Sequence, residues 1–395
     1  MRVVFPYLAQ LHQVYHSLPI AAEMALRYPH VRVHAAGATS AHVEFIGNLL
    51  ERFAPRARVL LDRFDVLTLR TVNYGRKSRL LFRNRDYLRS FDAIVTPERS
   101  SLFLRRIGLG GTKLIWTRHG AGDRAIGFAD DIHQFDYVLM AGRKIEARLL
   151  ASGQIRPGCY TTGVYSKFDW LGSTPPPRLF DNDAPVVLYN PHFQSKLSSW
   201  PRMGHAILEF FATHPEWNLI FAPHVRLFDP PTADKYREFE RYGGVSNVLV
   251  DLGSERSIDM TYLTAADLYL GDVSSQVAEF MRRPRPCMFL NAYGADWRND
   301  ASYRSWTLGP VVDTLDDFER TLEQAFATHG DFTKAQHEYV ADTFDLPPGS
   351  SSAARGACAI VSYLENTADA ARSNARLQGA TAPPRQRHGT TAARL

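Results

Sequence analysis

The chain has 395 residues, which at roughly 100–200 residues per domain predicts two domains rather than one. Hydrophobic residues make up 45% and charged residues 22%, which excludes wholesale disorder, a collagen-like repeat and a disulfide-stapled scaffold. Cys159, Cys287 and Cys358 are far apart and form no CxxC motif. We therefore expect no zinc ribbon, thioredoxin motif or iron–sulfur cluster, and we expect a reducing compartment.

The formal net charge of +5 is concentrated in two places. Residues 366–395 hold five arginines and one acid, a net charge of +4. Arg52–Arg89, called the basic segment below, holds eleven basic residues and three aspartates, a net charge of +8. The rest of the chain is therefore about −7, which argues against a nucleic-acid partner. A polyanion or an anionic membrane surface would suit the basic segment; the alternative is an ordinary solvated face.

Short apolar runs alternate with amphipathic stretches in the first half of the chain. The expected strands are Arg2–Phe5, Val31–Ala35, Phe91–Thr96, Lys113–Thr117 and Tyr137–Met140, and the expected helices are Leu18–Arg27, Ser100–Arg106 and Arg143–Ser152. Strands separated by helix-length segments predict βαβ units and a parallel sheet.

A linker is expected at residues 172–183, because three successive prolines, 175–177, cannot continue a helix or a central strand. The alternation then resumes. The expected strands are Val186–Tyr189, Leu219–Ala222, Val248–Leu252, Leu268–Leu270 and Cys287–Leu290, and the expected helices are Gly204–Thr213, Ala233–Arg241, Met260–Ala265, Ser275–Met281, Leu315–Ala327 and Gln336–Asp342.

The repeated alternation predicts an α/β protein with two doubly wound, Rossmann-like domains that face a cleft. We place the first domain at residues 1–171, the second at 184–365, and a disordered basic tail at 366–395, where Leu377 and Leu395 are the large apolar residues. Ligands bind such sheets outside the carboxyl ends of the strands.

No apolar run approaches the roughly 20 residues of a membrane span. Met1–Leu8 lacks the long apolar core and the cleavage site of a signal peptide. We therefore expect a cytoplasmic protein; peripheral association with the inner face of the cell membrane is the alternative.

A histidine follows the fourth expected strand. Lys113–Trp116 runs into Arg118, His119 and Gly120, and Gly122 follows. The glycines allow the backbone to turn sharply and approach a ligand, and a histidine at a strand end can act as a general base near neutral pH. We interpret His119 as that base, with Arg118 and Gly120 beside it in the cleft; the alternative is a histidine hydrogen-bonded within its loop.

Two Pro-His sequences follow expected strands after the linker. Asn190 and His192 come after the first, and His224 and Arg226 come after the second. An arginine can bind a phosphate through two parallel hydrogen bonds, which lysine cannot do. We expect these residues to face the cleft, and the alternative for each is a solvated loop position.

The stretch from Leu270 to Phe280 is the most informative. A strand meets a helix through Gly271-Asp272, with Ser274 and Ser275 at the start of the helix. We expect Asp272, Ser274 and Ser275 to belong to the donor nucleotide site. Free backbone N–H groups and the helix dipole favour an anion there, and two hydroxyls add donors for a pyrophosphate. Glu279 lies one turn after Ser275, where a carboxylate can accept both ribose hydroxyls. The alternative is a plain N-cap by Asp272 or Ser274 with a surface glutamate.

Other catalytic motifs are absent from the sequence. No HExxH, GxSxG, P-loop or GxGxxG occurs. His12 and His16 are four residues apart and could share a helix face, but a metal site would need a third ligand. We therefore expect no metal and no cofactor.

Five motifs occur in an order that resembles a known family. They are Trp116-Thr-Arg-His-Gly120, Thr162-Gly-Val-Tyr-Ser-Lys-Phe-Asp169, Tyr189-Asn-Pro-His-Phe193, Ala222-Pro-His224 and Gly271-Asp-Val-Ser-Ser275. From about Phe91 to Leu290 the chain resembles the CDP-glycerol glycerophosphotransferase family of teichoic-acid polymerases and primases, which implies a GT-B-type glycosyltransferase fold. The helix after Asp272 is also similar to the nucleotide-binding helix of UDP-N-acetylglucosamine 2-epimerases.

The resemblance implies roles for the matching residues. His119 would be the general base that deprotonates the acceptor hydroxyl. Ser274 and Ser275 would hold the donor pyrophosphate. His224 and Arg226 would neutralise that pyrophosphate and help the nucleotide to leave.

The resemblance further implies that Glu279 holds the ribose and that Asn190 and His192 line the donor site. The chain departs from the family pattern where Thr117 and Arg118 separate the tryptophan from the histidine, and where Pro-His replaces His-Pro. These departures would also fit a nucleotide-sugar donor.

The expected function is transfer of glycerol phosphate, or of a related polyol phosphate or sugar, from a CDP- or other nucleotide-activated donor. The acceptor would be a hydroxyl on an anionic polymer or a lipid-linked molecule of the cell envelope. Two alternatives stay open: a UDP-N-acetylglucosamine 2-epimerase-like or nucleotide-sugar enzyme, and a non-catalytic nucleotide-binding protein.

Overall fold

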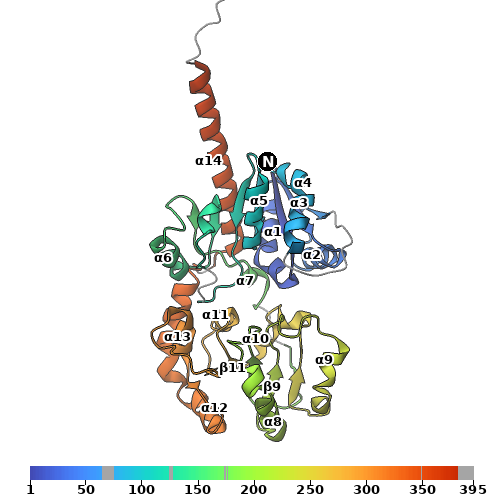
Figure 1. Cartoon of the computed structure of the whole chain (residues 1–395), viewed down its shortest axis with the longest axis vertical. Helices are drawn as coiled ribbons and strands as arrows, with labels where there is room; N and C mark the ends of the chain where they lie inside the picture. Colours follow the sequence, from blue (N-terminus) through green and yellow to red (C-terminus); the bar gives the residue numbers. More distant parts are fainter. Residues whose placement is uncertain (65–74, 124–127, 173–174, 176, 348, 381–395) are drawn as a thin grey trace, which may run out of the picture.

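The computed structural model describes residues 1–64, 75–123, 128–172, 175, 177–347 and 349–380. It contains two units, each built around a parallel β-sheet with helices on its faces (Figure 1). The predicted α/β architecture of two doubly wound sheets is confirmed. Residues 65–74 of the basic segment, 173, 174 and 176 of the linker, and 381–395 of the tail lie outside the described residues.

The first sheet has seven strands in the order β3-β2-β1-β4-β5-β6-β7. The strands are β1 (Arg2–Tyr7), β2 (Arg32–Gly37), β3 (Val59–Arg63), β4 (Ala93–Thr96), β5 (Lys113–Trp116), β6 (Tyr137–Leu139) and β7 (Tyr160–Thr161). The β1–β2 register runs from Arg2 opposite Arg32 to Tyr7 opposite Gly37. Val3, Val4 and Phe5 are fully buried, as expected for a central parallel strand covered on both faces.

Helical segments connect these strands. They are η1 (Leu11–His16), α1 (Leu18–Arg27), α2 (Ser40–Phe53), α3 (Gly75–Arg83), α4 (Arg85–Arg89), η2 (Arg99–Leu102), α5 (Phe103–Ile107), η4 (Ile132–Gln134), α6 (Arg143–Ala151) and α7 (Lys167–Trp170).

The second sheet has six strands in the order β10-β9-β8-β11-β12-β13. Its strands are β8 (Val186–Asn190), β9 (Asn218–Phe221), β10 (Val248–Val250), β11 (Leu268–Gly271), β12 (Cys287–Leu290) and β13 (Val311–Val312). Its helical segments are η5 (Trp200–Gly204), α8 (His205–Thr213), α9 (Ala233–Arg237), η6 (Glu240–Tyr242), η7 (Glu255–Ser257), α10 (Thr261–Ala265), α11 (Ser275–Phe280), η8 (Ala301–Leu308), α12 (Phe318–Ala327) and α13 (His329–Thr343).

The expected C-terminal boundary is wrong, because the chain returns to the first unit. Helix α14 (Ser352–Ala380) packs along α1 and extends past the first unit (Figure 1). Residues 352–365 were expected in the second domain, yet Ala357, Ile360 and Val361 are buried against the first unit's core. Residues 366–380, expected to be disordered, continue the helix, since they are rich in alanine, the strongest helix former.

Some elements of the first unit escaped prediction. β3 is an edge strand whose Leu60 and Leu61 remain exposed, so it lacks the in–out alternation of a buried strand. α2 places Ile46, Leu49 and Leu50 in the core at helical spacing, a pattern that was overlooked. Among the described residues, no helix has both the length and the apolar character that crossing a membrane requires.

Candidate functional site

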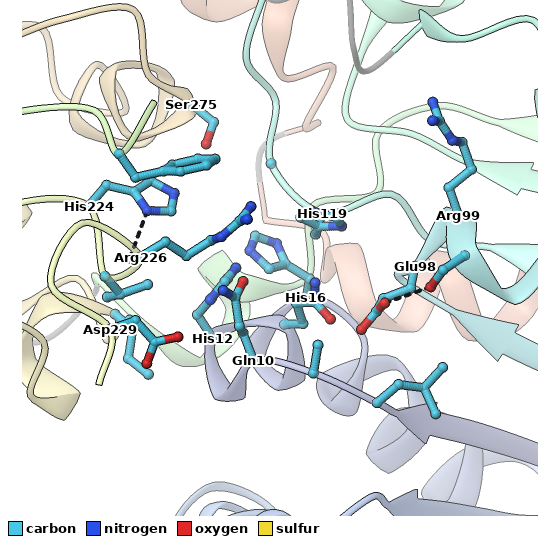
Figure 2. Close-up of a pocket in the computed structure, with 18 of the residues that line it drawn as sticks. Gln10, His12, His16, Glu98, Arg99, His119, His224, Arg226, Asp229 and Ser275 are labelled. Atoms are coloured by element: carbon cyan, nitrogen blue, oxygen red, sulfur yellow. Dashed lines mark hydrogen bonds between the residues drawn. The ribbon is translucent and has the colours of Figure 1, made fainter. Parts of the chain in front are cut away.

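A cleft of about 1060 Å³ lies between the two units, where the carboxyl ends of both sheets converge (Figure 2). Its walls come from the segments that follow β1, β2, β3, β4, β5 and β7 and, in the second unit, β8, β9, β10 and β11. Nine of the eleven predicted site residues line it: Arg118, His119, Gly120, His192, His224, Arg226, Ser274, Ser275 and Glu279. The two halves of the predicted site therefore face one space, as is typical of ligand sites in doubly wound sheets.

His119 is in the tautomer that a general base requires, with one ring nitrogen free to accept a proton. Its Nδ1 lies 2.7 Å from the carbonyl oxygen of Pro97, and because a carbonyl can only accept, Nδ1 carries the proton. Nε2 of the neutral ring is then the basic nitrogen. The cleft walls desolvate the ring and lower the pKa of His119 below its ordinary value, although Glu98 and the Pro97 carbonyl partly oppose this shift. His119 is nevertheless exposed to solvent and can receive a substrate proton.

Two further histidines, considered above only as weak metal ligands, lie beside His119. His12 and His16 belong to η1, directly after β1, and both line the cleft. Their ring centroids lie 6.3 Å and 6.4 Å from the His119 centroid. Desolvation lowers the pKa of both rings well below the ordinary histidine value. Their position at the end of the first strand was the signal that could have identified them.

The two Pro-His sequences form matching turns. The backbone N–H of Gln194 donates to His192 Nδ1 at 3.0 Å, and that of Arg226 donates to His224 Nδ1 at 3.2 Å. An N–H can only donate, so Nδ1 is unprotonated and the proton of each neutral ring sits on Nε2. These imidazoles are therefore donors through Nε2, the opposite tautomer to that of His119. The sequence resemblance between the two turns reflects the same local geometry.

The Phe193 ring packs against the side chains of the second unit that can donate hydrogen bonds into the cleft. Its ring centroid lies 4.5 Å from that of His192 and 4.6 Å from that of His224. The Arg226 guanidinium lies over the same ring, 4.1 Å from its centroid. This cation–π contact orients an exposed arginine toward the cleft, where Figure 2 shows its tip pointing at the histidines of the first unit.

The loop after β5 touches the start of α11. A Cβ at Gly120 would lie 3.1 Å from Ser275 Cβ, and a Cβ at Gly122 would lie 3.1 Å from Ser275 Cα. Ser274 caps α11, its hydroxyl accepting from the Gln276 N–H at 3.2 Å. The His119 loop and the Ser274–Ser275 turn thus form one continuous wall across the two units.

Replacing Gly120 by alanine should weaken this contact between the units. Gly120 has a φ of +76°, which disfavours alanine, and the added methyl group would crowd Ser275. Gly110 is a matched control, since its φ is +62° and no atom lies within 4 Å of a Cβ there. We expect Gly120→Ala to lower the free energy of unfolding by roughly 1 kcal/mol more than Gly110→Ala. If urea unfolding shows that Gly120→Ala and Gly110→Ala lose equal free energies of unfolding, the contact with Ser275 does not contribute to stability.

Glu279 is a buried clamp between the units rather than a surface glutamate. Its Oε2 pairs with Lys167 Nζ at 2.7 Å, and its Oε1 accepts from the Tyr165 hydroxyl at 2.5 Å. Burial beside this carboxylate raises the pKa of Tyr165 well above its ordinary value, so the hydroxyl keeps its proton and donates. Ribose binding was the expected role of Glu279, and it would have to use the lone pairs that Lys167 and Tyr165 leave over.

The motif from Thr162 to Asp169 is where the two units and α14 are joined. Besides the bonds from Tyr165 and Lys167 to Glu279, the Ser166 hydroxyl donates to the His16 carbonyl at 2.8 Å. The carboxylate of Asp169 accepts from the backbone N–H groups of Ser352 and Ala353, the first residues of α14. The motif therefore supports the cleft from behind, and of its residues Lys167 lines the cleft.

Asn190 and Asp272 do not line the cleft, contrary to expectation. The Asn190 amide donates to the Ala222 carbonyl at 2.6 Å and accepts from the Tyr269 hydroxyl at 3.0 Å. Asp272 Oδ2 accepts from the His192 and Ser199 N–H groups at 2.8 Å and 2.9 Å, and the residue is fully buried. Both side chains turn inward and hold the donor-side loops in place.

The buried carboxyl of Asp272 should make folding stability depend on pH. Burial raises its pKa to about 7, so between pH 3.8 and 7 the folded protein holds a proton that the unfolded chain releases. Stability from this residue is complete below pH 3.8 and falls as the pH rises toward 7. Between pH 5 and 7 we expect the wild type to lose about 2 kcal/mol more than Asp272→Asn in urea unfolding. If the two lose the same amount, Asp272 does not titrate in this range.

Arg118 lines the cleft beside His119, with a left-handed φ of 41°. Its guanidinium lies over the Phe128 ring, 4.5 Å from the centroid, and 5.7 Å from that of Trp116. Desolvation and the nearby Arg148 lower its pKa to about 10, which leaves it a cation at neutral pH. It contributes positive charge to the cleft wall.

The described residues bring together one group with metal-ligand spacing, formed by His214, Glu216 and Glu319. It lies outside the cleft, and exposed acidic groups commonly occur without a metal. His12 and His16 form no such group with a third ligand in the described part of the chain.

No protein-family model matches the chain, and no curated protein matches it by sequence. Solved structures do align with it over most of its length. The wall teichoic acid polymerase TagF aligns with a TM-score of 0.59 at 13% identity, covering 93% of this chain and 90% of that chain. A putative UDP-N-acetylglucosamine 2-epimerase from Listeria monocytogenes aligns with a TM-score of 0.60 at 12% identity, covering 92% and 97%.

The chain has a GT-B fold. A UDP-GlcNAc 2-epimerase from Neisseria meningitidis, bound to UDP-GlcNAc, has the same arrangement, with a TM-score of 0.58 at 13% identity over 93% of this chain and all of that one. The predicted likeness to teichoic-acid polymerases and to epimerases is thus confirmed for the fold. In this GT-B chain the cleft between the two sheets is the candidate active site.

Proposed function

We propose that this GT-B protein transfers a group from a nucleotide diphosphate-activated donor to an acceptor hydroxyl. The observation that carries the proposal is that the imidazoles on the two sides of the cleft are in opposite tautomers. His119 presents a basic Nε2 from the first unit, while His192 and His224 present Nε2–H donors from the second. A base on one side and anion-binding donors on the other are what such a transfer requires.

In the proposed reaction, His119 Nε2 removes the proton of the acceptor hydroxyl. The acceptor oxygen then bonds to the phosphorus or carbon atom of the transferred group. The bond from that atom to the nucleotide phosphate oxygen breaks, and its electron pair leaves with the nucleotide. Ser274, Ser275, His224 and Arg226 compensate the charge on the departing phosphate.

The donor we favour carries glycerol phosphate or a related polyol phosphate. TagF is a polymerase of wall teichoic acid, and one of its structures followed a soak with CDPG. The motif order from Trp116 to Ser275 favours the same chemistry. A nucleotide sugar is the second candidate donor, supported by the likeness to an epimerase bound to UDP-GlcNAc.

An anionic acceptor suits the first unit. Lys77, Arg79 and Arg83 of the basic segment line the cleft on α3, and Arg99 lines it on η2. An acceptor bearing phosphate groups, as a free polymer or at a membrane surface, would meet this charge as it approaches His119.

A thermal-shift screen tests the donor. CDP-glycerol, CDP-ribitol, UDP-sugars and CMP-sugars are each added to the intact chain, and a donor at about 100 times its Kd stabilises the folded state by about 2.7 kcal/mol. Product analysis with the binding donor then separates the candidates: transfer to an added hydroxyl acceptor supports the proposal. Epimerisation of UDP-N-acetylglucosamine alone would support the epimerase instead. Binding without any turnover would indicate a non-catalytic nucleotide-binding protein.

A further inference from the structure

His12 occupies the middle of the cleft. It lies in η1 of the first unit, and Figure 2 shows it beside His16 and close to the side chain of Arg226, which reaches over from the second unit. Within the described part of the chain, no group forms a hydrogen bond with this ring, and the His119 ring approaches it edge-on, with 6.3 Å between the centroids. The half-buried imidazole is thus placed between the units without a structural partner.

The groups facing His12 are cationic or can become so. His119 and Lys167 face it from the first unit, and His224 and Arg226 face it from the second. His16 adds a further imidazole from the same helical segment.

The acids of the cleft balance only part of its charge, since seven lysine and arginine residues line it against three acids. Glu279 pairs with Lys167, and Glu98 pairs with Lys77. Asp229 lines the cleft beside Arg226 and is exposed. The cleft lining as a whole therefore keeps an excess of positive charge, which attracts an anionic ligand.

We propose that His12 binds the diphosphate of the donor from the first unit and takes up a proton from solvent as this anion enters. The inference rests on the proposed function. A diphosphate held by Ser275, His224 and Arg226 on the second unit would turn its remaining oxygens toward the first unit, where His12 lies. A protonated imidazole supplies a charged donor at that face.

Donor binding is then coupled to pH. Desolvation, and after it the surrounding groups that carry or can carry positive charge, hold the pKa of free His12 well below 6.5, so the ring is neutral at pH 7. The two negative charges of a bound diphosphate diester raise this pKa. Affinity therefore increases as the pH falls, by up to tenfold per pH unit for one proton.

Isothermal titration calorimetry tests this coupling. CDP-glycerol and UDP-N-acetylglucosamine are suitable probes, since their diphosphate diesters do not themselves titrate near neutral pH. Each is titrated into the intact chain at pH 7 in PIPES and in imidazole, whose ionisation enthalpies differ. We expect the wild type to take up as much as one proton per donor bound. His12→Gln should bind about tenfold more weakly and take up none.

His337→Gln is the matched control, because His337 is exposed on α13 outside the cleft and should leave affinity and proton uptake unchanged. An equal affinity and equal proton uptake in His12→Gln and the wild type would overturn the role of His12 alone. An enthalpy that is identical in both buffers for the wild type would overturn it even if the variant did not fold. Failure of the wild type to bind any nucleotide diphosphate would overturn the proposed function, and this inference with it.

Discussion

Replacing His119 by asparagine should lower kcat by about 10²–10⁴-fold while leaving the donor Kd within about twofold. The asparagine amide can still donate to the Pro97 carbonyl, which accepts from His119 Nδ1 at 2.7 Å, so the loop keeps its anchor. What disappears is the basic Nε2. The donor contacts proposed on the second unit are untouched, because they involve α11 and the Pro-His turns. Steady-state kinetics and donor titration on the same preparation measure both quantities.

The pH dependence of turnover identifies the base. Desolvation lowers the pKa of His119 below 6.5, so its Nε2 stays unprotonated at neutral pH. With the donor held at saturation, so that its pH-dependent affinity does not enter, kcat/KM for the acceptor should therefore be level through neutral pH. It should fall only as the pH drops below that lowered value. Asparagine does not titrate, so this acidic fall should vanish in the variant's residual activity. An unchanged rate, or an acidic fall that persists in His119→Asn, would assign the base to another residue, of which His16 is the nearest buried candidate.

The position of His119, His224 and Ser275 could be predicted because each directly follows an apolar strand of a parallel sheet. The carboxyl ends of such strands meet at one edge, so chain position alone brings these residues to the cleft. The same pattern gave a wrong prediction for Asn190, the last residue of β8, and for Asp272, which follows β11. A strand end does not determine whether a side chain turns outward to a ligand or inward to an orphan backbone group, and both residues turn inward.

Other features depend on contacts that no local pattern reveals. Lys167 lies 112 residues before Glu279 in the chain. The sequence around Glu279 therefore did not reveal that its carboxylate pairs with a buried lysine. The return of α14 to the first unit likewise depends on α1 leaving an apolar face to be covered. Its composition resembled a disordered tail, yet alanine forms helices readily once one end of the segment is packed.

Replacing Glu279 by glutamine should lower the free energy of unfolding by about 3–5 kcal/mol. Lys167 and Glu279 have side chains only 7% and 5% exposed, so neutralising the acid leaves a buried ammonium without a counter-charge. The double variant Lys167→Met, Glu279→Gln removes both charges and should recover much of the loss, since it buries neither ion alone. Urea unfolding of the wild type and the three variants, including Lys167→Met, gives the coupling energy.

An exposed ion pair provides the control for this cycle. Asp234 and Arg237 are 2.7 Å apart with side chains 77% and 69% exposed, so Asp234→Asn should change stability by less than about 1 kcal/mol. A loss no larger than this in Glu279→Gln would show that the buried pair does not hold the two units together.

Donor affinity distinguishes the two roles considered for Glu279. If Glu279 only joins the two units through Lys167, then Lys167→Met and Glu279→Gln weaken donor binding alike. If it holds the ribose, only the change at Glu279 does so, because Lys167 then supports the fold without touching the nucleotide.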